Sequence, residues 1–170
     1  MQKLYLDCDG VILDTINKSY QMIKEQKIEG EKNIRKFYRE LDWKQLIIDS
    51  GEINDSISKI IKLSKNFDIE ILTHINSDNE IKEKKEFFAK KLPGIKVITV
   101  PKNTNKCDIV NSKDNILVDD YIPNLEKWKE KGGIPVKFSD SGKECEFITI
   151  TDLLELLEID FNVKKKVKEK

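Results

Sequence analysis

Residues 4–15 read LYLDCDGVILDT, and this stretch decides the fold. Three apolar residues lead into Asp7 and Asp9, which one residue separates and Gly10 follows. Because successive side chains of a strand point to opposite faces, two carboxylates at this spacing project to the same side. We therefore interpret residues 3–7 as a buried strand that delivers a pair of carboxylates.

A second apolar segment, residues 115–118, also ends in two carboxylates, Asp119 and Asp120. Ligands of parallel sheets bind beyond the carboxyl ends of the strands, so we expect both acidic pairs in one pocket. At ~4 Å and an effective dielectric constant of ~20, each pair of like charges costs about 4 kcal/mol. A divalent cation removes this repulsion, and oxygen ligands favour Mg²⁺ over zinc or copper. The sequence therefore predicts a magnesium site.

Length and composition limit the classes of protein to consider. A chain of 170 residues fits one domain with a small insertion. Its 31 basic and 31 acidic residues cancel, so no net field attracts polymeric nucleic acid. No apolar run approaches the ~20 residues of a membrane span. Three scattered cysteines and one histidine exclude a disulfide framework and a His-rich zinc site. The N-terminus enters a strand without a leader, so we expect a cytoplasmic protein.

Strand and helix patterns alternate after residue 66. We predict strands at 67–73, 95–100, 115–118, 134–138 and 147–150. A capping-box pattern of Ser77 and Glu80 opens the first intervening helix. Strands that alternate with helices are typical of a doubly wound parallel sheet, so the predicted fold class is Rossmann-like α/β.

Residues 16–66 contain no convincing strand and have a helical period of apolar residues. We predict that they form a small helical cap inserted after the first strand. The core domain then comprises residues 1–15 and 67–160, and residues 161–170 form a charged tail. Four aromatic residues of the cap either stack on a substrate or form the cap's own core: Tyr20, Phe37, Tyr38 and Trp43.

Three further residues are candidates for binding a phosphate. Thr73 ends the second predicted strand, and His74 follows it. Lys106 precedes the last acidic strand, and Lys102, four residues earlier, is an alternative to it. The acidic pocket would repel a phosphate dianion unless a cation is bound there. The Thr73 hydroxyl and Lys106 would then complete the coordination of the phosphate.

These motifs, in this order, resemble the haloacid dehalogenase (HAD) superfamily of phosphohydrolases over most of the chain. The family's four motifs correspond to Asp7-Cys8-Asp9-Gly10-Val11, Ile71-Leu72-Thr73, Lys106 and Asp119-Asp120. Residues 120–125 (DYIPNL), residues 132–136 (GGIPV) and Asp14 are similar to the small 5'(3')-deoxyribonucleotidase branch. Members of that branch carry a helical cap where residues 16–66 lie.

The resemblance implies an Mg²⁺-dependent phosphatase that hydrolyses phosphomonoesters, with nucleoside monophosphates as the expected small substrates. Asp7 would be the nucleophile that forms an aspartyl-phosphate. Asp9 would protonate the leaving alkoxide and then take a proton from the hydrolytic water. The implied metal ligands are Asp7, the backbone carbonyl of Asp9, Asp120, and Asp119 directly or through water. Thr73 and Lys106 would hold the transferring oxygens, and His74 would touch the phosphate or the substrate.

Other functions share these residue types. A sugar-phosphate mutase or another phosphotransferase has a similar first loop, and its product would be an isomerised sugar phosphate rather than free phosphate. A phospho-acceptor signalling domain also places acids, Thr and Lys on a parallel sheet, but its phosphorylated Asp follows the third strand. A scaffold without activity is a further alternative. The sequence leaves the exact substrate and the oligomeric state open, including a homodimer.

Overall fold

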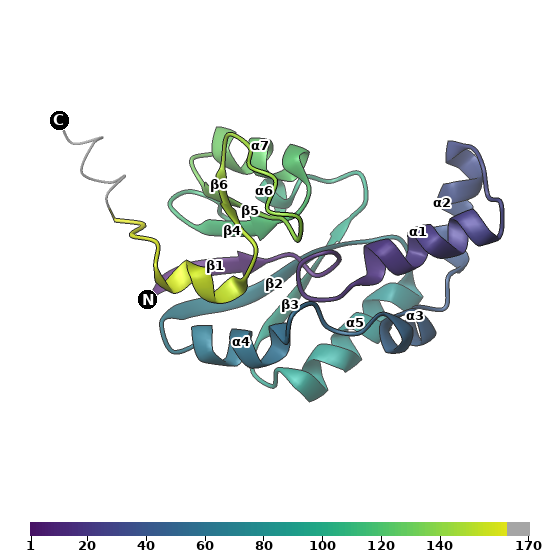
Figure 1. Ribbon diagram of the computed structural model, residues 1–170, viewed down its shortest axis with the longest axis horizontal. Helices are drawn as coiled ribbons and strands as arrows, with labels where there is room; N and C mark the ends of the chain where they lie inside the picture. Colours follow the sequence, from purple (N-terminus) through teal and green to yellow (C-terminus); the bar gives the residue numbers. More distant parts are fainter. Residues whose placement is uncertain (163–170) are drawn as a thin grey trace.

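The computed structural model describes residues 1–162, which form one six-stranded parallel sheet of order β3-β2-β1-β4-β5-β6 (Figure 1). The strands are β1 (Gln2–Leu6), β2 (Phe67–Ile75), β3 (Lys96–Pro101), β4 (Ile116–Asp119), β5 (Ile134–Phe138) and β6 (Ile148–Ile150). The parallel α/β sheet predicted from the sequence is thereby confirmed.

The central strand β1 decides where the site lies. Leu6, its last residue, pairs with Ile71 of β2 on one side and with Val118 of β4 on the other. Leu4 and Leu6 are wholly buried, because helices cover both faces of the sheet. Burial of each such side chain stabilises the fold by about 1.5–3 kcal/mol. The chain therefore leaves β1 between two neighbouring strand ends, where parallel sheets place their ligands.

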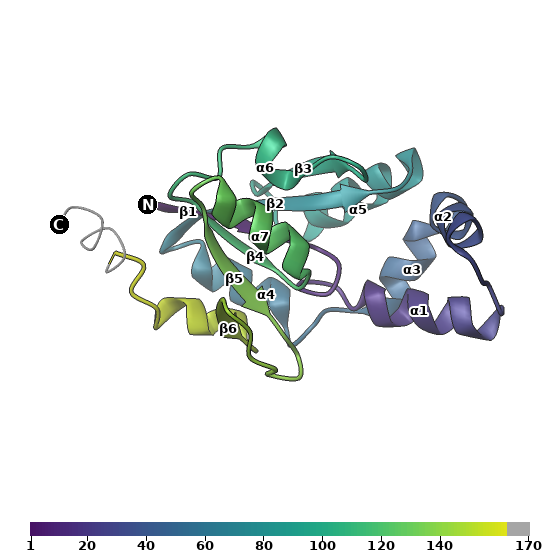
Figure 2. The same ribbon diagram turned by 90° about the horizontal axis from the view of Figure 1, so that it is seen from above.

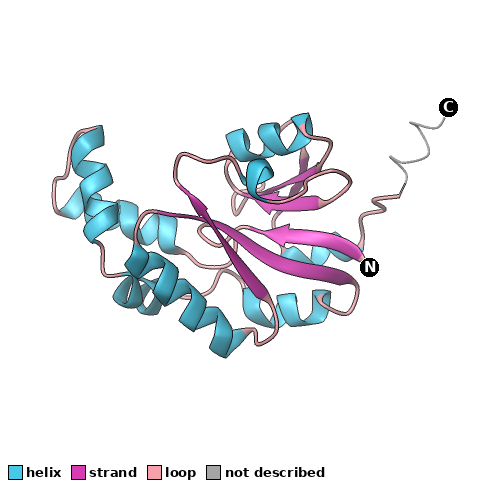
Figure 3. Ribbon diagram, turned by 180° about the vertical axis from the view of Figure 1, so that it is seen from behind, coloured by secondary structure: helices cyan, strands magenta, loops and turns pink. Residues whose placement is uncertain are grey.

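Helices lie on both faces of the sheet (Figure 3). They are α1 (Thr15–Glu25), α2 (Glu31–Glu40), α3 (Trp43–Ser50), α4 (Ser56–Leu63), α5 (Asp78–Lys91), α6 (Lys106–Ile109) and α7 (Ile122–Glu130), with a 3-10 helix, η1 (Leu153–Leu157). Ser77 caps α5 as predicted, since its hydroxyl accepts a hydrogen bond from the Glu80 N–H at 3.1 Å. Within residues 1–162, no helix combines the length and the apolar character needed to cross a membrane.

Helices α1, α2 and α3 extend to one side of the sheet (Figures 1 and 2). They share an apolar cluster around Leu41, Trp43 and Leu46, against which Phe37 and Tyr38 pack. Three of the four cap aromatics thus belong to this cluster, whereas the fourth, Tyr20, is exposed.

Helix α4 lies within the range predicted as a cap but packs elsewhere. Ile57, Ile60 and Leu63 are buried in the main apolar cluster together with residues of the sheet. We therefore propose that a cap, if it moves as a unit, comprises α1–α3 alone. Of the predicted tail, Phe161 packs edge-on against Phe67, and residues 163–170 lie outside the described residues.

Two chain segments connect the core to helices α1–α3, residues 12–14 on the way out and residues 51–53 on the way back, and they lie next to each other. The Asp14 N–H donates to the Gly51 carbonyl at 3.1 Å, and the Ile53 N–H donates to the Ile12 carbonyl at 2.9 Å. The two crossings therefore lie side by side. The Asp14 carboxylate accepts from the Asn17 side chain at 2.9 Å, a local contact at the start of α1.

Candidate active site

Asp7 and Asp9 lie in the tight loop that follows β1. Backbone N–H groups of Ile12 and Leu13 both donate to the Cys8 carbonyl, at 2.9 and 3.1 Å, which folds the loop tightly. Gly10 has φ +81°, and a Cβ there would lie 2.4 Å from a carboxylate oxygen of Asp120. A glycine is therefore required both by the turn and by the close approach of Asp120.

Three of the four predicted acids meet at the carboxyl end of the sheet. Asp7, Asp119 and Asp120 each offer a carboxylate oxygen, and these oxygens lie within 4.8 Å of one another. Burial and the charge of Asp119 raise the pKa of Asp7 well above its usual range. The same two causes raise the pKa of Asp120 to about 7. An all-oxygen cluster with this excess of negative charge fits a hard divalent cation such as Mg²⁺.

The carboxylate of Asp9 lies outside this cluster. Strand alternation predicted that Asp7 and Asp9 project to one side, but β1 ends at Leu6 and the loop redirects the following residues. Asp9 accepts hydrogen bonds from Lys84 and from the Thr15 hydroxyl, each at 2.6 Å. The prediction of its backbone carbonyl as a metal ligand is unaffected by this side-chain position.

Lys106 is the predicted lysine that enters the site. It is the first residue of α6, only 2% of it is exposed, and its Nζ donates to Asp7 Oδ1 and Asp119 Oδ2 at 2.7 Å each. Although burial lowers the pKa of Lys106, the carboxylates of Asp119 and Asp7 raise it above its ordinary value. The alternative, Lys102, is exposed and lies 6.0 Å from the centre of the Tyr38 ring. Lys106 therefore remains charged between two of the clustered acids.

Asp119 is held by more partners than the sequence predicted. Its Oδ1 accepts from the Tyr121 N–H at 2.9 Å, and its Oδ2 accepts from the Asn124 side chain at 3.0 Å. Both donors follow within five residues, in the DYIPNL segment. Asp119 is thus oriented to hold Lys106, which leaves Asp120 as the more accessible carboxylate of this pair.

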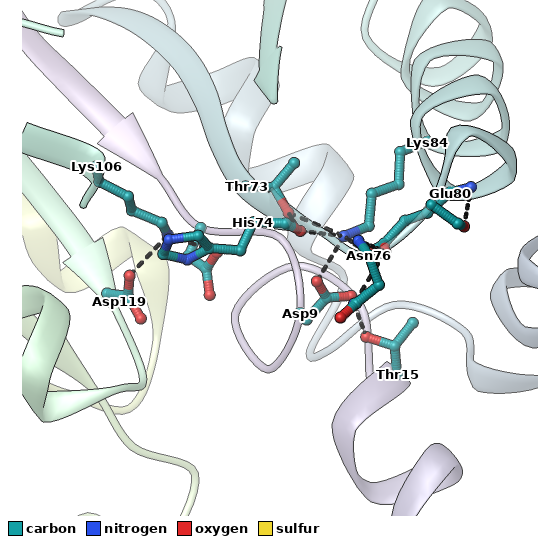
Figure 4. Close-up of polar contacts among 11 residues, drawn as sticks. Asp9, Thr15, Thr73, His74, Asn76, Glu80, Lys84, Lys106 and Asp119 are labelled. Carbon is teal, nitrogen blue, oxygen red and sulfur yellow. Dashed lines mark hydrogen bonds and ion pairs between the residues drawn. The ribbon is translucent and has the colours of Figure 1, made fainter. Parts of the chain in front are cut away.

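Thr73 and Lys84 form a second polar group beside the first, as Figure 4 shows. Lys84 of α5 is wholly buried, and its Nζ donates to Asp9 at 2.6 Å, to Glu80 at 2.7 Å and to the Thr73 hydroxyl at 2.9 Å. Reasoning from the sequence missed Lys84. The available signal was its spacing of four residues from Glu80, on the helix that follows Thr73.

His74 lies between these two groups, and its side chain is bound to the neighbouring loop (Figure 4). Its Nε2 is 2.8 Å from the Thr104 carbonyl, which accepts only, so Nε2 carries the proton. Burial lowers the pKa of His74, and the neutral ring then offers an acceptor, not a donor, at Nδ1. Its contact with phosphate stays a prediction, and the geometry favours a role in ordering the loop.

No protein-family model matches the sequence, and a sequence search of curated proteins gave no match. Solved structures do match. A Bacillus subtilis protein described as a HAD hydrolase, YfnB, bound to magnesium, aligns with a TM-score of 0.62 and 13% identity, over 92% of this chain and 97% of that chain. A HAD phosphatase from Thermococcus onnurineus aligns with a TM-score of 0.60 and 15% identity, over 93% and 97%. The chain has the fold of the HAD-superfamily hydrolases.

Another structure with this HAD fold is a D,D-heptose 1,7-bisphosphate phosphatase from Burkholderia thailandensis. It aligns with a TM-score of 0.56 and 14% identity, over 94% of this chain and 100% of that chain. Asp7, Asp119 and Lys106 meet because they lie at or after the carboxyl ends of strands of one parallel sheet. Thr73, which was predicted to end its strand, lies two residues before the end of β2 and contacts Lys84 instead.

A cleft of about 670 Å³ lies beside the acidic cluster, and Asp120 is the one clustered acid that lines it. Gly10 and Asp120 form part of its wall. Polar side chains from the cap junction and from the loop after β5 line much of the rest: Asp14, Asn17, Glu52, Asn54, Ser139 and Ser141. Lys137 also lines the cleft and donates to the backbone carbonyl of Asp120. The cleft therefore leads from solvent to a candidate metal ligand.

Magnesium affinity is expected to rise with pH through about pH 7, because the pKa of Asp120 is raised to about 7, the pKa of Asp7 is raised as well, and a carboxylate must lose its proton to bind metal. Below about pH 7, each unit is expected to weaken binding by at least about tenfold. Titration calorimetry in buffers of different ionisation enthalpy measures both the affinity and the protons released. An affinity that stays constant between about pH 5.5 and pH 8 would contradict this assignment.

Proposed function

We propose that this protein is an Mg²⁺-dependent phosphatase that hydrolyses phosphomonoesters through an aspartyl-phosphate on Asp7. One observation carries the proposal: the Asp7 carboxylate is buried between Lys106, at 2.7 Å, and the carboxylates of Asp119 and Asp120. A nucleophile in this setting lies beside both a fixed cation and a site for a second one. Two solved proteins with the same fold are named as phosphatases, which supports the same reaction class.

The residues of this chain divide the reaction into two steps. Asp7 attacks phosphorus, and the bond from phosphorus to the leaving oxygen breaks while Asp9, which enters this step as the protonated acid, gives that oxygen its proton. Water then attacks the phosphorus of the aspartyl-phosphate while Asp9 takes a proton from that water. Inorganic phosphate is released, and the free carboxylate of Asp7 is restored. Lys106 stays charged throughout and offsets the negative charge around Asp7. The Thr73 hydroxyl contacts Lys84, which in turn contacts Asp9.

Mg²⁺ would be held by Asp7, Asp120 and the backbone carbonyl of Asp9, with Asp119 in support. When bound, it would neutralise charge on the phosphoryl oxygens. The cluster of three carboxylates and the raised pKa of Asp120 are the features of this chain that fit such an ion.

We propose nucleoside monophosphates as the substrates, on the resemblance of residues 120–125 and 132–136 to the nucleotidase branch. The cleft volume of about 670 Å³ falls within the ~300–1,000 Å³ typical of small-molecule sites. A second candidate is a sugar phosphate, because the cleft wall is rich in hydroxyl, amide and carboxylate groups and one protein of this fold is a heptose bisphosphate phosphatase.

A panel of substrates tests the proposal. Purified protein is incubated with nucleoside monophosphates, deoxynucleoside monophosphates and sugar phosphates, with Mg²⁺ and with chelator, and inorganic phosphate is measured. We expect Mg²⁺-dependent release of phosphate from at least one class. An isomerised sugar phosphate without free phosphate would identify a mutase instead. No turnover of any phosphomonoester would defeat the proposal.

A further inference from the structure

The carboxylate of Asp9 is fixed through both of its oxygens. Its Oδ1 accepts from the Thr15 hydroxyl at 2.6 Å, and its Oδ2 accepts from Lys84 Nζ at 2.6 Å (Figure 4). Thr15 is the first residue of α1, whereas Lys84 lies in α5 against the sheet. Asp9 is thus held between the first cap helix and the core.

A buried hydrogen-bond network fixes the Lys84 side chain in contact with Asp9. The Lys84 and Glu80 side chains are 0% and 1% exposed, respectively, and their charged atoms lie 2.7 Å apart. The second oxygen of Glu80 accepts from the Asn76 N–H at 2.6 Å, which fixes Glu80 to the loop after β2. Burial of two charges is costly and rarely improves stability over apolar residues of the same size. A role in the site explains the network better than a role in stability.

The cap covers this network. The Lys84 Nζ lies 4.8 Å from the centre of the Trp43 ring, within the range of a cation–π contact. Trp43 is the first residue of α3, and its backbone N–H donates to the Asn79 side-chain oxygen at 3.1 Å. The start of α3 is therefore seated on the first turns of α5, directly over the lysine that holds Asp9.

We propose that Lys84 is a positioning residue, which holds Asp9 in the orientation needed for proton transfer while Trp43 keeps water from this contact. This inference rests on the proposed phosphatase function. Asp9 has to give a proton to the leaving oxygen in the first step and take one from water in the second. Lys106 contacts the nucleophile Asp7, whereas Lys84 contacts Asp9, so the two buried lysines serve different residues of the reaction.

Lys84→Met tests the proposal with two kinds of ester. An alkyl phosphate needs a proton on its leaving oxygen, whereas p-nitrophenolate leaves without one. For Lys84→Met we expect kcat on an alkyl phosphate to fall by about 10²-fold with KM within a few-fold. The first release of p-nitrophenolate should stay close to the wild-type rate, followed by slow turnover. Lys84→Arg should restore part of kcat, and Lys85→Met, an exposed neighbour on the same helix, should behave as wild type.

An equal loss on both esters in the rate at which the leaving group is first released, or no loss on either, would overturn the proposal. If Lys84→Met does not fold, Trp43→Leu leaves the lysine in place and should give the same selective loss, at about tenfold. A crystal structure of Lys84→Met supplies a readout that needs no activity. Asp9 is expected to rotate away from Thr15, and an unmoved Asp9 would overturn the inference. If the proposed phosphatase function itself is wrong, the wild type will be inactive on every phosphomonoester. That result differs from a failure of the inference about Lys84, in which the wild type is active.

Discussion

Asp7→Asn is expected to reduce phosphate release by at least about 10⁴-fold, because an amide cannot replace the carboxylate that attacks phosphorus. The side chain keeps its size, and one of the three clustered negative charges disappears. Without metal, the variant should therefore unfold at the same temperature as the wild type or higher. The measurements are kcat at saturating Mg²⁺ and thermal unfolding with chelator.

Asp114→Asn is a matched control, since Asp114 is exposed and lies just before β4, outside the acidic cluster. It should retain wild-type kcat. Full activity in Asp7→Asn would show that Asp7 is not the nucleophile. A loss of activity that comes with a large fall in stability would show that Asp7 is structural.

Lys106→Met is expected to lower the free energy of unfolding by about 3–5 kcal/mol, because Asp7 and Asp119 lose the cation buried between them. The same change should reduce kcat by about 10²–10³-fold, as charge next to the transferring group is lost. Urea unfolding with and without Mg²⁺ measures the first effect. Since a divalent ion also neutralises the acids, Mg²⁺ should stabilise the variant more than it stabilises the wild type.

Lys102→Met serves as the control, because Lys102 is exposed and four residues away. Its free energy of unfolding should change by less than about 0.5 kcal/mol. If Lys102→Met lost activity while Lys106→Met kept it, the choice between these two lysines would be reversed.

The sheet and most of the site residues were predictable because they are local features of the chain. Each buried strand is a short apolar run, and the acids and Thr73 stand where such runs end. Parallel strands bring their carboxyl ends to one edge of a sheet, so the order of the motifs was sufficient to predict their convergence.

The remaining features depend on tertiary packing. In a chain with 31 basic residues, a lysine in a polar helix is expected to be solvated, and nothing local marks Lys84 as buried. The apolar stripe of α4 predicted a buried face but not that the sheet, rather than the cap, covers it. Strand alternation failed for Asp9 because β1 ends at Leu6 and Asp9 lies in the tight loop that follows.

The most direct test of the account is to find where phosphate is attached during turnover. Protein incubated with Mg²⁺ and a ³²P-labelled phosphomonoester is quenched in acid, digested and mapped by mass spectrometry. Label is expected on Asp7 in the wild type, and none is expected in Asp7→Asn. Phosphate release without label on Asp7, or with label on another residue, would contradict it.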